Sequence, residues 1–166
     1  MADVANSKLL KTKTGILNIE DAFLVLVKTE WNAAIVDELE KGCIAVLKKN
    51  KIKKIVTIVV PGSLEIPFAI NNCWENATKK NKPDAFIALG CVIRGGTPHF
   101  DYVCKGVTDG ITRLNLSLPV PSIFGVLTVD NEEQATERIG GSHGHKGEEA
   151  AITALKMVSL SRSFKK

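Results

Sequence analysis

Short runs of apolar residues alternate along the chain with longer segments in which apolar residues recur at helical spacing. The runs predict strands, and their continuous apolar character is typical of parallel strands covered on both faces; they span residues 22–27, 54–60, 85–89 and 120–127. The longer segments predict helices over residues 32–49, 65–80, 99–116, 131–138 and 146–160. This alternation predicts an α/β fold, a three-layer α/β/α sandwich with a four-stranded parallel sheet. Residues 15–19 could add a short N-terminal edge strand.

Composition narrows the class of protein. The chain has 166 residues, enough for a single domain over residues 15–166 that follows a polar tail over residues 1–14. The formal net charge is +4, and the lysines cluster at helix ends and turns without interleaved aromatic residues, so nucleic-acid binding is not expected. Residues 1–14 lack the apolar core of a signal peptide, and no apolar run approaches a membrane span. We therefore expect a cytoplasmic protein with no membrane partner.

Cysteine and histidine spacings give little support for a metal site. The four cysteines show no paired short spacing, which argues against both a zinc site and a redox pair. His143 and His145 have a spacing that metals can use, but without a third ligand a polar turn is the better interpretation. We expect neither a metal nor a cofactor.

The densest candidate chemistry lies in residues 88–101, where an apolar run ends in glycines, an arginine, a threonine and a histidine. Open α/β sheets bind ligands beyond the carboxyl ends of their strands. Gly95 and Gly96 let the backbone approach an anion at the N-terminus of the next helix. His99 lies in the first turn of that helix, where it can exchange protons with a substrate; a lone helical histidine is more often structural, but this position favours catalysis.

Three separated segments resemble lumazine synthases, in the same order and over about residues 22–164. They are residues 60–67 (VPGSLEIP), residues 90–101 (GCVIRGGTPHFD), and residues 124–128 (FGVLT) with Glu133, Gln134 and Arg138. The resemblance implies a flavodoxin-like fold and the condensation of 5-amino-6-(D-ribitylamino)uracil with 3,4-dihydroxy-2-butanone 4-phosphate. The products would be 6,7-dimethyl-8-ribityllumazine, phosphate and water, in the penultimate step of riboflavin biosynthesis, without metal or cofactor.

Two other functions remain open on the sequence. One is a non-catalytic flavin-binding or shell-forming protein of the same fold. The other is a flavodoxin-like FMN binder, although its phosphate loop should follow the first strand, where residues 28–32 (KTEWN) lack the expected serine, threonine and glycine.

The resemblance also implies roles for residues at the ends of the first two strands. Trp31, where the family usually has phenylalanine, would stack on the pyrimidine ring beside Asn32. As an ordinary aromatic residue Trp31 would instead cap the core. Ser63, Leu64 and Glu65 would bind the ribityl chain, with Glu65 accepting hydrogen bonds from its hydroxyls. An acid at a helix start is also stabilised by the helix dipole alone.

The remaining roles follow the third and fourth strands. The residues that would hold the pyrimidine ring are Cys91, Val92 and Ile93, and a nucleophilic role for Cys91 is not supported. Gly96 and Thr97 would bind the phosphate, and His99 would donate a proton. Phe124, at the end of the fourth strand, and Arg138 would reach the site of the next subunit, where Arg138 pairs with phosphate.

The resemblance further implies an assembly. The shared site requires a homopentamer, and the compact segment 138–146, which lacks an insertion, favours packing of pentamers into an icosahedral shell. Riboflavin synthase is a candidate partner. Arg94 is expected to be a structural or interface residue. Ser142 stands where many members of the family carry a lysine, which places more of the phosphate binding on Arg138.

Overall fold

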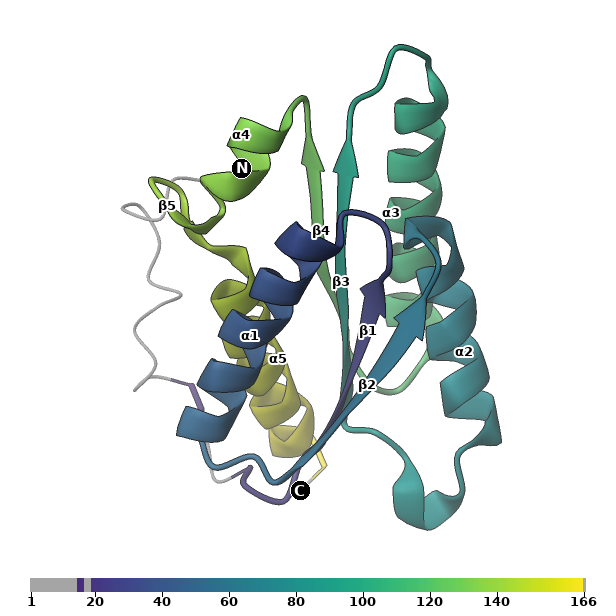
Figure 1. Cartoon of the computed structure of the whole chain (residues 1–166). Helices are drawn as coiled ribbons and strands as arrows, with labels where there is room; N and C mark the ends of the chain where they lie inside the picture. The colour runs from purple at the N-terminus through teal and green to yellow at the C-terminus, as the bar shows by residue number, and fades with distance from the viewer. Residues whose placement is uncertain (1–14, 17–18, 166) are drawn as a thin grey trace.

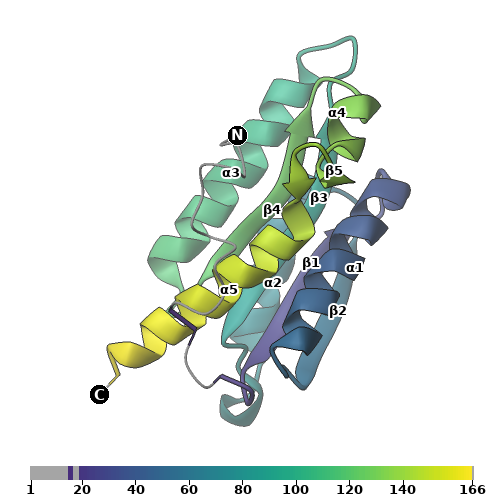
Figure 2. The same ribbon diagram turned by 90° about the vertical axis from the view of Figure 1, so that its left-hand side faces the viewer.

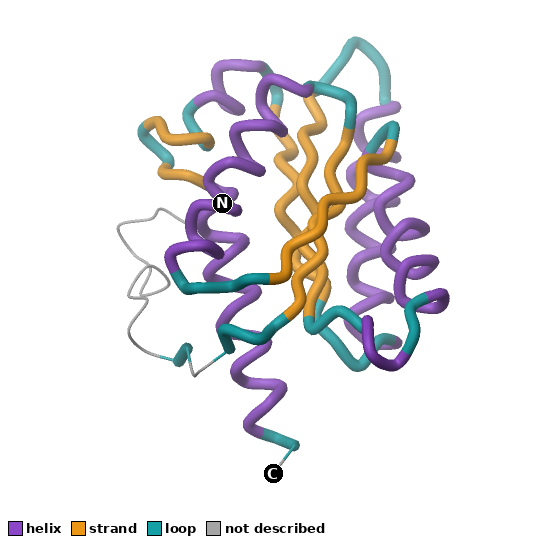
Figure 3. The backbone as a smooth tube through the Cα atoms, turned by 60° about the horizontal axis from the view of Figure 1, so that its bottom comes forward, coloured by secondary structure: helices purple, strands orange, loops and turns teal. Residues whose placement is uncertain are grey.

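The structure, a computed structural model, describes residues 15–16 and 19–165 and is built around one parallel sheet (Figure 1). Its order is β2-β1-β3-β4, made of β1 (Phe23–Thr29), β2 (Lys54–Val60), β3 (Ala85–Ile93) and β4 (Ser122–Val129). One face is covered by α1 (Ala33–Lys49) and α5 (Lys146–Ser163), and the other by α2 (Ile66–Asn76) and α3 (His99–Ser117) (Figures 1 and 3). The predicted three-layer α/β/α sandwich is confirmed.

Smaller elements fill the connections between the large ones. Two 3₁₀ turns, η2 (Ser63–Glu65) and η3 (Lys79–Asn81), flank α2. The short helix α4 (Glu132–Thr136) is followed by an antiparallel hairpin of β5 (Ile139–Gly141) and β6 (Gly144–His145). The predicted polar turn lies at Ser142 and His143, between the two short strands, and His145 ends β6.

The N-terminal predictions are tested only in part. The tail over residues 1–14 lies outside the described residues. In the expected edge strand, residues 15, 16 and 19 belong to no strand, and residues 17 and 18 lie outside the described part of the chain.

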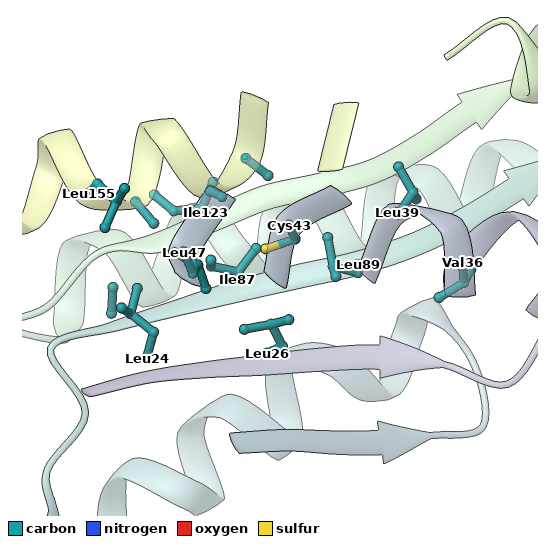
Figure 4. Packing of buried hydrophobic residues seen from close by; sticks show 14 of the residues in the cluster. Leu24, Leu26, Val36, Leu39, Cys43, Leu47, Ile87, Leu89, Ile123 and Leu155 are labelled. Carbon is teal, nitrogen blue, oxygen red and sulfur yellow. The ribbon is translucent and has the colours of Figure 1, made fainter. Parts of the chain in front are cut away.

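The core lies on both faces of the sheet because successive side chains of a strand point to opposite sides. Leu24 and Leu26 of β1 face α1 and α5, where they pack with Leu39, Cys43 and Leu155 (Figure 4). The alternate residues Val25 and Val27 belong to a second buried cluster with residues of α2 and α3. Burial of these strand residues on both sides explains why the apolar runs were continuous.

Helices α1 and α5 run side by side on their face of the sheet (Figure 2). Gly147, at the start of α5, brings the two backbones together: a Cβ atom there would lie 2.0 Å from the carbonyl oxygen of Leu39. The start of α5 is therefore held against α1 by direct backbone approach, which fixes the connection from β4 to α5.

Among the helices of the described residues, none is both long and apolar enough to cross a membrane.

Candidate active site

The loops after β1, β2 and β3 all leave the same carboxyl edge of the sheet, and the loop after β3 rises farthest, at the top of Figure 1. The first two loops are joined by main-chain hydrogen bonds. The N–H of Glu30 donates to the carbonyl of Val60 at 2.9 Å, and that of Trp31 donates to the carbonyl of Pro61 at 3.3 Å. Ligands of open α/β sheets bind at such an edge. We call the predicted site residues of these three loops the strand-end group: Trp31, Asn32, Ser63, Leu64, Glu65, Cys91, Val92, Ile93, Gly96, Thr97 and His99.

Trp31 is not a core residue, since 73% of its surface is exposed. Its Cδ1 lies 3.6 Å from the point where a Cβ on Gly62 would stand, and Oε2 of Glu65 lies 3.0 Å from that same point. The indole and the carboxylate therefore flank Gly62 on one side of the loop. An open aromatic face beside an acceptor suits a ligand with a flat ring and hydroxyl groups.

Asn32 links the first loop to the third. Its backbone is left-handed, with φ 57° and ψ 42°, at the position immediately before α1. Its side-chain amide donates to the carbonyl oxygen of Cys91 at 2.9 Å rather than capping the helix. Asn32 thus holds the loop that carries Trp31 against the end of β3.

The side chains of Ser63 and Leu64 are engaged in packing. Ser63 is buried, and its Oγ lies 3.0 Å from the position of a Cβ on Gly90 of β3. One methyl of Leu64 lies 2.5 Å from the position of a Cβ on Gly106 of α3. Both glycines make room for these neighbours, so η2 is seated between β3 and α3, while Glu65 and the rest of Leu64 are exposed.

Cys91, Val92 and Ile93 belong to β3 itself, whereas the sequence predicted that the strand ends at residue 89. They pair with Leu127, Thr128 and Val129 of β4, which extends the strand beyond the predicted end. Cys91 is buried, and burial raises the pKa of its thiol to about 11. A thiol held neutral at ordinary pH is a poor nucleophile, as the sequence analysis expected.

The loop after β3 is anchored at Arg94 and open beyond it. Arg94 pairs with Asp130 at 2.9 Å and with Asp101 at 3.3 Å, as expected of a structural residue. A Cβ on Gly95 or Gly96 would meet no atom of the described chain within 4 Å. Packing within the subunit therefore does not require glycine at these two positions, which leaves space for a ligand or a neighbouring subunit.

Thr97 and His99 follow these glycines as exposed residues, and His99 is the first residue of α3. The free N–H groups of the first turn of a helix favour an anion nearby. The glycines, the hydroxyl of Thr97 and the imidazole thus lie together at the start of a 19-residue helix.

The other two predicted residues, Phe124 and Arg138, lie elsewhere. Both line a groove of about 1110 Å³ between β4 and α5, which we call the β4 groove. Phe124 is the third residue of β4 rather than its end, because the strand runs from Ser122 to Val129, two residues later at both ends than predicted. Its ring is 41% exposed although it lies mid-strand. Among the described residues, the lining of the groove includes none of the strand-end group.

Arg138 lines the groove, and only part of its guanidinium has hydrogen-bond partners among the residues that the structure describes. Its side chain is 16% exposed, and Nη1 donates to the carbonyl of Gln134 at 2.7 Å. Within the described structure, the buried Nε has no hydrogen-bond partner. A buried donor without a partner is costly, and an anion in the groove would satisfy it.

Lys146 is a residue of the groove that the sequence analysis did not assign. It is 8% exposed, lines the groove with Arg138 and pairs with Glu149 at 2.6 Å. A lysine at the start of a helix is disfavoured by the helix dipole, and the carboxylate of Glu149 offsets part of that cost. One feature of the sequence could have identified Lys146: a predicted helix begins with this lysine, eight residues after Arg138.

Histidines of the β5–β6 hairpin have protein partners. Nε2 of His143 lies 3.6 Å from Glu137, and the ring of His145 caps α5. In the part of the chain that the structure describes, no group of three or more His, Cys, Asp or Glu residues is placed to hold a metal ion.

Comparisons with known proteins agree with this architecture. The family model for 6,7-dimethyl-8-ribityllumazine synthase matches residues 21–162. The protein of that name from Parabacteroides distasonis is 49% identical over 82% of this chain and 84% of its own length. Its counterpart from Porphyromonas gingivalis is 48% identical over 86% and 88%, and that from Christiangramia forsetii is 42% identical over 99% and 98%. The chain belongs to the 6,7-dimethyl-8-ribityllumazine synthase family.

Proposed function

We propose that the carboxyl edge of the sheet is where this chain performs the reaction of its family. That reaction condenses 5-amino-6-(D-ribitylamino)uracil with 3,4-dihydroxy-2-butanone 4-phosphate to give 6,7-dimethyl-8-ribityllumazine, phosphate and water, and it belongs to riboflavin biosynthesis. The observation that carries the assignment of the site is the exposure of Trp31, Glu65 and His99 together at this edge. The three supply a stacking surface, an acceptor for hydroxyls and a proton-transfer group.

Each part of the pyrimidine substrate meets matching chemistry in the strand-end group. Trp31 stacks on the ring, and Glu65 accepts hydrogen bonds from the ribityl hydroxyls. The side chain of Ser63 is buried against Gly90, so Ser63 contacts the ribityl chain through its backbone, whereas Leu64 also offers the exposed half of its side chain. The exposed parts of Val92 and Ile93 border the pyrimidine ring, together with Asn32. Backbone N–H and C=O groups of these residues bind the polar edge of the ring.

The phosphate is bound from two sides. Gly96, Thr97 and the first N–H groups of α3 face it in one subunit. Arg138 and Lys146, which line the β4 groove, approach it from the next subunit. Because β2 and β4 are the two outer strands of the sheet, an interface that joins unlike edges is heterologous, and such an interface forms a ring when its rotation closes.

The number of subunits in the ring is five by family resemblance, and Phe124 would then contribute to the neighbour's site. The compact hairpin over residues 139–145 supports assembly of pentamers into a shell. A single domain over residues 15–166, a cytoplasmic location and riboflavin synthase as a partner remain predictions.

Catalysis follows from placing two reactants together. The 5-amino group of the pyrimidine adds to the ketone, and loss of water gives an imine. Phosphate then leaves, the product tautomerises, and the ribityl-bearing nitrogen attacks the second carbonyl, with loss of another water. His99 transfers protons between these groups, while proximity supplies most of the acceleration.

An assay of the purified chain with both substrates, followed by lumazine absorbance, tests the function. Product must form faster than in the uncatalysed mixture at the same substrate concentrations. A rate equal to that background would overturn the proposal, and stoichiometric flavin without turnover would indicate a flavin-binding protein instead.

Trp31 should report ligand binding by fluorescence. Riboflavin or the pyrimidine substrate should quench the tryptophan emission, since a stacked ring lies in contact with the indole. Trp31→Phe should remove most of the quench and retain substantial turnover, because phenylalanine still provides a stacking face. Trp74→Phe is the matched control, and a quench lost in that variant instead would refute the stacking assignment.

His99→Ala should lower kcat by roughly 10–100-fold, less than the full span of general acid–base catalysis, because proximity is retained. The KM values for both substrates should change little, since the imidazole moves protons rather than anchoring either ligand. Steady-state kinetics from pH 5.5 to about 9 would measure this, with His143→Ala as the control. A loss beyond about a thousandfold would show that proton transfer, not proximity, limits the rate.

A further inference from the structure

A main-chain hydrogen bond at the start of α5 joins Arg138 and Lys146, the two cations of the β4 groove. The N–H of Lys146 donates to the carbonyl oxygen of Arg138 at 2.8 Å. The seven residues between them form the β5–β6 hairpin and its turn. The spacing of the two cations therefore depends on how the end of this hairpin is held.

His145 holds the end of the hairpin in two ways. Its Nδ1 accepts a hydrogen bond from the N–H of Glu148 at 3.4 Å and so caps α5. The same ring lies against α1 at Gly42, where a Cβ would stand 2.1 Å from Cε1 and 2.5 Å from Nδ1. A side chain at residue 42 is incompatible with the present position of the ring.

Gly42 lies in the interior of α1, where glycine is less favourable than alanine. Its φ is not positive, so the backbone does not require glycine. The close approach of the His145 ring is the reason that the helix needs a glycine there. We call this arrangement the Gly42 notch.

We propose that His145 is a positioning residue for phosphate binding. Seated in the Gly42 notch and capping α5, it fixes Arg138 and Lys146 at the spacing that the phosphate of the four-carbon substrate requires. The inference rests on the proposed function, which places that phosphate in the β4 groove. Displacements near 1 Å in a binding group are enough to weaken productive binding strongly.

A double-mutant cycle tests the notch. Gly42→Ala displaces the ring, and we expect the KM for the four-carbon phosphate to rise about tenfold while the pyrimidine KM and kcat change less than about twofold. His145→Ser keeps an oxygen that can cap α5 but empties the notch, so it alone should raise the phosphate KM several-fold. In the His145→Ser background, Gly42→Ala should cause no further rise, because nothing remains to clash.

Gly110→Ala is the matched control. Its Cβ would stand 2.4 Å from Pro67, so it introduces a similar clash in a helix, between two residues that do not line the β4 groove. It should lower the melting temperature without raising the phosphate KM. Additive effects of Gly42→Ala and His145→Ser would overturn the proposal, as would equal rises in both KM values.

If Gly42→Ala fails to fold, His145→Ser decides alone, and an unchanged phosphate KM in that variant overturns the proposal. Arg138→Ala separates this inference from the proposed function. A phosphate KM raised by Arg138→Ala but not by His145→Ser refutes only the positioning role. A phosphate KM unaffected by Arg138→Ala refutes the placement of the phosphate itself.

Discussion

Arg138→Ala should raise the KM for the four-carbon phosphate by about 100-fold, while the KM for the pyrimidine changes little. Two charge-assisted hydrogen bonds from the guanidinium to phosphate contribute about 1.5–3 kcal/mol each, part of which Lys146 can replace. Within the described residues the buried Nε of Arg138 has no hydrogen-bond partner, so it can donate to a bound phosphate without breaking an existing bond. Steady-state kinetics with each substrate varied in turn would measure the effect.

Two variants sharpen this measurement. Arg113→Ala removes an exposed arginine of α3 and should leave both KM values unchanged. Arg138→Lys keeps the charge but loses the planar fork, so its phosphate KM should lie between those of the parent chain and Arg138→Ala. An unchanged phosphate KM in Arg138→Ala would remove Arg138 from the site.

Co-expression of two impaired variants should restore activity if each site is shared between subunits. Arg138→Ala impairs the β4 groove, and Glu65→Ala impairs the strand-end group. In a ring of randomly mixed chains, about a quarter of the interfaces pair an intact groove with an intact strand-end group. Activity of the mixture should therefore reach about a quarter of the parent value, well above that of either variant alone.

The control for this experiment is a mixture of the two variants purified separately and assayed before subunit exchange, which should show no recovery. Light scattering on each sample would give the number of subunits and show whether shells form. A mixture that never exceeds its separate components would contradict the shared site, provided that the masses show mixed rings. A fully active monomer would contradict it outright.

The fold was predictable because each large element carries a local signal. The strand over residues 54–60 agrees with β2 at both ends, since its β-branched run stops at a proline and a glycine. The end of β3 was misplaced because Gly90, a residue of weak strand propensity, interrupts the apolar run. Pairing with Leu127 and its neighbours on β4 extends the strand, and that contact is not visible in the local sequence.

The candidate site was predictable only in part. Glycines and a histidine after an apolar run indicate a ligand at the strand end, so His99 and Gly96 could be identified from general chemistry. The proposal that Phe124 and Arg138 act from a second subunit rests on family resemblance, because the periodicity of one chain carries no signal for contacts between subunits. Lys146 was missed since its burial depends on the approach of α5 to β4, a tertiary contact.

Asn32 has a consequence for attempts to raise heat resistance by selection. Glycine adopts its left-handed backbone without steric cost, whereas asparagine does not. Only asparagine supplies the amide that donates to Cys91. A screen that scores only survival on heating therefore does not select directly against Asn32→Gly. Chains with this substitution lack the hydrogen bond that holds the first loop to β3. Screens on this scaffold should score turnover after heating, because survival on heating alone does not report whether the first loop is still held to β3.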